Sequence, residues 1–125
     1  MKISIIIPVL NEAENLKELL PFFSKIKNQE QQEVIVVDGG STDGTKEVVE
    51  KAGFRFLTCG IQSRAAQMNM GAKESNGDIL YFVHADVRIM PTFIEEIRSS
   101  LEEGFQAGCF AYDFDSPMKL LKVNA

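Results

Sequence analysis

Short, uninterrupted runs of β-branched and other apolar residues constrain this chain more than any other feature. The clearest runs are residues 3–10, 33–37 and 79–83. They lack the alternation of polar and apolar residues that marks a half-buried strand. A strand that is apolar on both faces is typical of a parallel sheet covered by helices on both sides. We expect two more strands at residues 54–58 and 105–114.

Segments with helical periodicity separate these runs and complete an alternating order of strands and helices. Gly53 and Gly104 are expected to end two of the helices, and Pro21 predicts a kink or an early stop in the first. The order predicts an α/β fold: a Rossmann-like, mainly parallel sheet flanked by helices, in a single domain over residues 1–125. The expected helices are residues 16–26, 45–52, 63–75 and 91–103, and residues 116–125 are expected to begin another.

Composition and charge exclude several classes of protein. A chain of 125 residues is long enough to bury a core, so Cys59 and Cys109 are expected to be free thiols. The net charge of −5 gives no electrostatic reason to bind nucleic acid. We find no apolar segment of membrane-spanning length and no signal peptide, so we expect a cytoplasmic protein without a membrane span. An anionic ligand must then be held by local features such as a metal ion, an Arg or backbone N–H groups.

Three polar clusters come directly after predicted strands, at residues 11–12, 38–43 and 84–86. Ligands of open parallel sheets bind in the crevice at the carboxyl ends of the strands. We therefore expect the three clusters to converge into one site despite their separation in sequence.

The second cluster begins with Asp38, a carboxylate at the end of a buried strand. Burial of a carboxylate is costly unless it finds hydrogen-bond donors, and a nucleobase or a ribose would supply them. Gly39 lets the backbone approach a ligand closely. Ser41 and Asp43 are further candidates for ligand binding, with the alternative that they only form a turn and cap the next helix.

Two more candidate groups follow along the chain. Strand-like alternation places His84 and Asp86 on one side, where Asp86 offers hard oxygen ligands to Mg²⁺ or Mn²⁺ and His84 can bind a ribose, a phosphate or Mn²⁺. A structural, hydrogen-bonded His84 is the alternative. Arg64 opens a predicted helix and can pair with a diphosphate, or it is simply a solvated side chain.

Phosphate-binding motifs of other classes are absent. The Gly-rich loop at residues 39–44 has no Gly-Lys-Ser/Thr ending, and it does not match G-x-G-x-x-G. An oxidoreductase that binds a dinucleotide is therefore disfavoured.

Four blocks, in order, resemble the family 2 glycosyltransferases, and together they cover nearly the whole chain. Residues 6–12 (Ile-Ile-Pro-Val-Leu-Asn-Glu) and 36–45 (Val-Val-Asp-Gly-Gly-Ser-Thr-Asp-Gly-Thr) are similar to the opening of that family. Residues 64–72 resemble its third block. Residues 81–86 (Tyr-Phe-Val-His-Ala-Asp) fall where the family carries its D-x-D metal motif, and His-Ala-Asp at this point resembles a bacterial branch.

The resemblance implies the nucleotide-diphospho-sugar transferase fold (GT-A) and a donor site. It implies that Asp38 holds the nucleobase, that Pro8, Asn11 and Glu12 line the same pocket, and that Arg64 lies near the nucleotide. It also implies that Asp86 binds a divalent metal, Mn²⁺ or Mg²⁺, on the diphosphate. The implied partners are a nucleotide-diphosphate sugar and an acceptor hydroxyl.

Family members are longer, and their later segments supply the acceptor pocket and a catalytic base. Asp113 and Asp115 do not match the motif of that base, so none is assigned. We expect a C-terminally truncated chain that binds the donor with weak or absent transfer. Two alternatives remain: a non-catalytic nucleotide-binding module, and a nucleotidyltransferase on a related fold. Apolar residues 120, 121 and 123 make a homodimer a further expectation.

Overall fold

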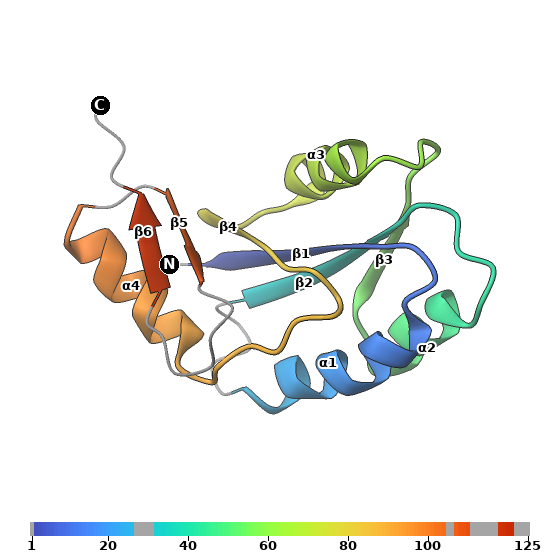
Figure 1. The fold of residues 1–125 in the computed structure, drawn as a ribbon, viewed down its shortest axis with the longest axis horizontal. Helices are drawn as coiled ribbons and strands as arrows, with labels where there is room; N and C mark the ends of the chain where they lie inside the picture. Colours follow the sequence, from blue (N-terminus) through green and yellow to red (C-terminus); the bar gives the residue numbers. More distant parts are fainter. Residues whose placement is uncertain (1, 27–31, 105–106, 111–117, 122–125) are drawn as a thin grey trace. The chain divides into compact units, whose positions relative to one another are not determined.

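Two buried strands, β1 (Ile3–Val9) and β2 (Gln32–Asp38), form the centre of a four-stranded parallel sheet. All seven residues of β1 and the last five of β2 are buried. β3 (Arg55–Thr58) pairs with β2 and β4 (Ile79–Phe82) pairs with β1, which gives the order β3-β2-β1-β4 (Figure 1). The prediction of a mainly parallel α/β sheet is confirmed.

The computed structural model describes residues 2–26, 32–104, 107–110 and 118–121. These residues belong to two compact units, Met1–Arg88 and Ile89–Ala125. The sheet and all the candidate site residues lie in the first unit.

Three helices cover the two faces of the sheet. α1 (Ala13–Lys25) and α2 (Thr45–Ala52) lie together on one face, and α3 (Arg64–Glu74) lies on the other (Figure 1). α2 has the predicted bounds and ends at Gly53, which has a φ of 83°. α1 does not stop at Pro21 but continues to Lys25. Cys59 is buried with a free thiol, as expected.

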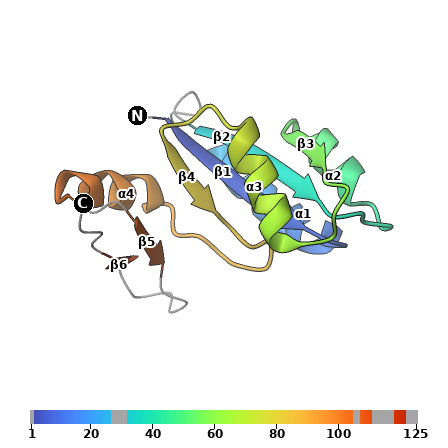
Figure 2. The ribbon, with the colours of Figure 1, turned by 90° about the horizontal axis from the view of Figure 1, so that it is seen from above.

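α3 packs against β1 and β2 at unusually short range, and Figure 2 views the sheet from this side. Its Gly71 is buried, and a Cβ atom added there would lie 2.4 Å from Cγ2 of Ile6 and 3.2 Å from Cγ2 of Val37. Only glycine therefore lets this helix lie so close to the sheet.

The second unit contains α4 (Phe93–Glu102) and an antiparallel pair, β5 (Ala107–Phe110) and β6 (Met118–Leu121). Part of the strand predicted at 105–114 is confirmed, but it lies in a separate two-stranded sheet. The expectation of a helix from residue 116 is wrong for 118–121. Such a short apolar stretch has no decisive periodicity, and the backbone of β5 supplies its hydrogen bonds. Val123 lies outside the described residues.

None of the helices in the described part of the chain has the length and apolar character needed to cross a bilayer.

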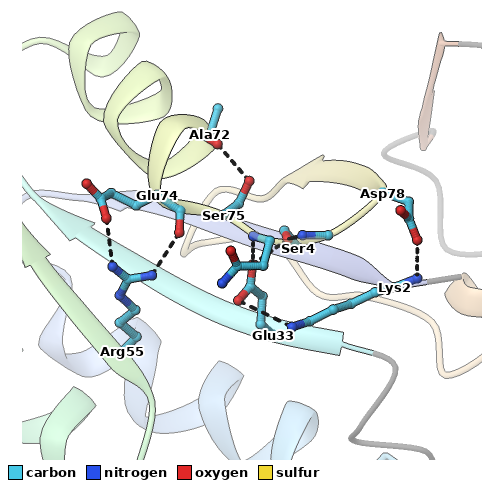
Figure 3. A network of polar contacts seen from close by, with 10 residues as sticks. Lys2, Ser4, Glu33, Arg55, Ala72, Glu74, Ser75 and Asp78 are labelled. Carbon is cyan, nitrogen blue, oxygen red and sulfur yellow. Dashed lines mark hydrogen bonds and ion pairs between the residues drawn. The ribbon is translucent and has the colours of Figure 1, made fainter.

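A network of polar side chains closes the sheet at the amino ends of its strands (Figure 3). Oε1 of Glu33 accepts hydrogen bonds from the Ser4 hydroxyl and from the backbone N–H of Asn76, both at 2.6 Å. The N–H of Gly77 donates to the Ser4 hydroxyl oxygen at 2.8 Å. The network therefore ties the loop before β4 to the starts of β1 and β2.

A second part of the network joins β3 to the end of α3. The guanidinium of Arg55 donates to the backbone oxygen and to Oε2 of Glu74, both at 2.8 Å (Figure 3). The amino ends of the strands are thus held by side chains that pair with one another.

We predict that Glu33 makes stability depend on pH. Burial alone would raise the pKa of Glu33, but hydrogen bonds from Ser4 and Asn76 and the charges of Lys2 and Arg55 bring it below its usual 4.5. The unfolded chain then binds the proton more readily, so this stabilisation is complete above about pH 4.5 and is lost as pH falls through the lower folded-state pKa. Urea unfolding at pH 7 should show Glu33→Gln less stable by about 1–2 kcal/mol. The difference should shrink toward pH 3, and a difference that stays constant with pH would contradict this role of Glu33.

We also predict that Gly71→Ala destabilises the protein although alanine is the better helix former. The gain in helix propensity is about 1 kcal/mol, and overpacking a tight contact costs about 1–3 kcal/mol. With the added methyl at 2.4 Å from Ile6, the upper end of this cost applies. Urea unfolding should show a net loss, while Lys73→Ala on the exposed side of α3 should be neutral or slightly stabilising. A more stable Gly71→Ala protein would contradict the close approach.

Candidate functional site

Asn11 joins the loop after β1 to the loop after β2. Its backbone N–H donates to the Ser41 hydroxyl oxygen at 2.7 Å, and its Oδ1 accepts from the N–H groups of Thr42 at 2.8 Å and Asp43 at 3.3 Å. Asn11 has a φ of 53°, a conformation that asparagine tolerates better than most residues. The first two predicted clusters therefore meet, as expected.

Asp43 links this loop to two helix starts. Its Oδ2 accepts from the N–H of Ala13, the first residue of α1, at 3.3 Å. Its Oδ1 accepts from the N–H of Thr45, the first residue of α2, at 3.0 Å and also from the Thr45 hydroxyl. The Thr45 hydroxyl is the main reason that the pKa of Asp43 is lowered, against an opposing effect of burial. The N-cap position of α2 is occupied by Gly44, so the expected side-chain cap is not formed there, and Asp43 bonds the first helical N–H from one position earlier.

Asp38 finds its hydrogen-bond donors within its own loop. Its Oδ2 accepts from the N–H groups of Gly40 at 3.0 Å and Ser41 at 2.9 Å, and its Oδ1 accepts from the Ser41 hydroxyl. The residue is only 5% exposed. The carboxylate at the end of β2 is thus compensated by the loop, and Ser41 is held between Asp38 and Asn11.

A residue that the sequence analysis left without a role, Gln67 of α3, lies at the centre of this edge. Its Nε2 donates to the backbone oxygens of Val9 and Val37, both at 2.9 Å. Gly39 packs on it so closely that an added Cβ would lie 3.1 Å from Oε1 of Gln67. One sequence signal could have found it: Gln67 is a polar residue four positions before Gly71, so both lie on the side of α3 that faces the sheet.

Pro8 lies near the end of β1, and Glu12 lies in the loop that follows it. Pro8 is buried in β1 beside Val37 of β2. Glu12 directly precedes α1, and its Oε2 accepts from Nδ2 of Asn15 at 2.7 Å.

The third cluster follows β4, which lies on the opposite side of β1 from β2. β4 ends at Phe82, and the N–H of Val87 donates to the backbone oxygen of His84 at 3.2 Å in a turn. The expected strand-like alternation therefore does not extend to His84 and Asp86. Nδ1 of His84 is buried without a hydrogen-bond partner among the described residues, and Asp86 is exposed.

Arg64 is exposed and is the first residue of α3. The hydroxyl of Ser63, the residue before it, accepts from the N–H of Ala66 at 3.4 Å. A cation at a helix N-terminus is disfavoured by the helix dipole, whereas an anion is favoured there. A bound anion would therefore relieve an unfavourable placement of this side chain.

The residues after β4 fit a divalent metal only in part. Nowhere in the described ranges do three His, Cys, Asp or Glu side chains gather to hold an ion. The exposed carboxylate of Asp86 offers oxygen ligands, and Mg²⁺ typically takes one or two carboxylates together with water and phosphate oxygens. The site thus fits a metal that arrives with, or is completed by, a phosphorylated ligand.

Known proteins resemble this chain in sequence and in fold. The profile described as "Glycosyl transferase family 2" matches residues 4–123. "Glycosyltransferase AglE" of Haloferax volcanii is 38% identical over 91 residues, which cover 67% of this chain and 30% of that protein. S. aureus TarS 1–349, solved in complex with UDP-GlcNAc, is 28% identical with a TM-score of 0.73, over 82% of this chain and 32% of that one.

A more distant structure has the same fold. The mannosyltransferase PcManGT from Pyrobaculum calidifontis, solved with GDP-Man and Mn²⁺, has a TM-score of 0.72 at 23% identity, over 79% of this chain and 32% of that one. This chain therefore spans about a third of the length of these relatives. The predicted GT-A fold is confirmed, and none of the three is named as a nucleotidyltransferase.

We predict that Asn11 stabilises the joined loops through both its side chain and its backbone conformation. Asn11→Ala removes two hydrogen bonds and forces alanine into the left-handed region, so the free energy of unfolding should fall by about 2–3 kcal/mol. Asn11→Gly loses the same bonds but tolerates the positive φ, so its loss should be smaller by about 1 kcal/mol. Urea unfolding measures both, and equal losses would contradict the role of the backbone.

Proposed function

The chain belongs to glycosyltransferase family 2, and from this premise we propose that its first 88 residues bind the nucleotide diphosphate of an activated sugar. One observation carries the proposal. The loops after β1 and β2 are joined by Asn11 and Asp43 at the carboxyl edge of a parallel sheet, where such folds bind ligands. TarS, whose structure matches this unit, binds UDP-GlcNAc.

We assign the base and ribose to the joined loops. Asp38 has both carboxylate oxygens held by its own loop, so it is already oriented when a nucleobase arrives. Pro8, Asn11, Glu12, Gly39, Ser41 and Asp43 surround the same edge and are assigned to the pocket.

The diphosphate is assigned to the residues at the start of α3 and after β4. Arg64 supplies a positive charge in a chain of net charge −5. His84 supplies a ring nitrogen without a partner in the described residues. Asp86 is the residue assigned to Mg²⁺ or Mn²⁺. Such an ion, when bound, stabilises the negative charge of the departing diphosphate.

The reaction assigned to the family member that carries this unit is sugar transfer. The bond from the anomeric carbon to the diphosphate breaks, a bond from that carbon to an acceptor hydroxyl forms, and the acceptor proton passes to a base. We place donor binding in the described chain and assign neither the acceptor nor the base. The cytoplasmic location and the homodimer expected from the sequence stay predictions.

A thermal-shift screen with UDP, GDP, CDP and dTDP, each with and without Mn²⁺ or Mg²⁺, tests the proposal. A ligand that binds only the folded state adds about 2.7 kcal/mol at a hundredfold excess over Kd. One nucleotide should raise the melting temperature in a metal-dependent way. Asp86→Asn should remove the metal dependence without changing the melting temperature of the free protein, because the residue is exposed.

Glu95→Gln is the matched control, because it neutralises another exposed carboxylate in α4. It should keep the full metal-dependent shift. If no nucleotide shifts the wild-type protein, or if Glu95→Gln and Asp86→Asn behave alike, the assignment of the donor site fails.

A further inference from the structure

Gln67 connects three elements that bear candidate site residues. It projects from α3, and both of its side-chain N–H bonds are used, one to the last residue of β1 and one to Val37 near the end of β2. Just beyond these oxygens β1 ends at Val9 and β2 ends at Asp38, and the loops that carry Asn11 and Ser41 begin. The side chain therefore holds the two loops at a fixed separation where the sheet ends.

Because Gln67 is buried, the hydrogen-bonding groups of the side chain at this position matter. Gln67 is only 5% exposed, so losing its two hydrogen bonds in this buried position would be costly. Val9 O also accepts from the N–H of Gly39 at 3.0 Å, which places the turn after Asp38 in the same group of contacts. An amide with two N–H groups satisfies both strand ends from one point, which neither an apolar side chain nor a carboxylate can do.

The same contacts fix the start of α3. Gln67 is three residues after Arg64, about 4.5 Å along the helix axis, and residues at this spacing share a face. Its backbone N–H donates to the oxygen of Ser63 at 2.9 Å, inside the first turn. A movement of Gln67 relative to the strands would therefore move Arg64 relative to Asp38.

We propose that Gln67 is a positioning residue for donor binding. It sets the distance between the proposed base pocket around Asp38 and the proposed diphosphate position at Arg64. The inference rests on the proposed donor site. A nucleoside diphosphate is preferentially bound at one separation between its base and its phosphates when both contacts are preformed, so a change in this distance weakens binding even when the fold is intact.

Isothermal titration, with Mn²⁺, of UDP, GDP, CDP and dTDP tests the inference on the whole chain. Gln67→Met keeps the approximate size but has no donor, and it should weaken binding of the recognised nucleotide by about tenfold or more. Val34→Ala is the matched control, because it removes buried volume at the start of β2, far from the loops. At comparable loss of stability, Val34→Ala should leave the Kd within about twofold.

Gln67→Glu supplies a readout that a purely structural role would not change. An ionised carboxylate repels both backbone oxygens, whereas its protonated form donates one hydrogen bond. The ratio of its Kd to the wild-type Kd should therefore fall as pH is lowered from 8 to 5.5, and the same ratio for Gln67→Met should stay constant. This variant also tests the inference if Gln67→Met does not fold.

Hydrogen exchange of the free protein separates this inference from the donor site itself. In Gln67→Met the N–H groups of Gly39, Thr42 and Asp43 should exchange faster, while those of Ile5 and Ile35 in the strand centres should not. If wild-type protein binds none of the four nucleotides of the thermal-shift screen, the donor proposal fails and the exchange data alone judge the positioning. Unchanged exchange at the loops, or affinity no weaker than in Val34→Ala, overturns the role of Gln67.

Discussion

The carboxyl edge of the sheet depends on how two buried parallel strands are terminated. Parallel strands leave the core with backbone N–H and C=O groups that the sheet no longer pairs, and burial makes each unpaired group costly. Here backbone and side-chain donors pair them together. The Val9 oxygen accepts from the N–H of Gly39 and from Gln67, which also bonds the Val37 oxygen, and Asn11 accepts from the N–H groups of Thr42 and Asp43. Backbone groups of both loops therefore have partners within the described residues.

The same bonds bear on how an acidic chain would hold the proposed anionic ligand. Asp38 at the end of β2 and Asp43 in the loop after it both accept hydrogen bonds from backbone N–H groups and hydroxyls. Their negative charge is thus compensated locally. In the proposed site the exposed Arg64 would attract the anion directly, and the exposed Asp86 would do so through a divalent cation.

Sequence reasoning succeeded where one local rule dominates. The β-branched runs gave the parallel sheet, because few other structures bury a strand on both faces. Gly53 gave the end of α2, because the left-handed conformation there needs glycine. It was wrong at residues 118–121, where a partner strand decides the structure of a stretch too short to have a period. The alternation assumed for His84 and Asp86 does not apply, because β4 ends two residues before His84. Gln67 was missed because its role exists only between elements that are far apart in sequence.

The two edges of the sheet differ in which groups pair with one another. At the amino edge Glu33, Ser4, Arg55 and Glu74 pair with one another and with the backbone, and the exception is Oε1 of Gln32, which is buried without a described partner next to residues 27–31. After β4, Nδ1 of His84 is likewise buried without a partner in the described residues. One unpaired side-chain atom therefore remains near each edge, and pairing alone does not tell the edges apart. The carboxyl edge is distinguished by its loops, because Asn11 and Asp43 join the segments that follow β1 and β2 where parallel sheets bind ligands.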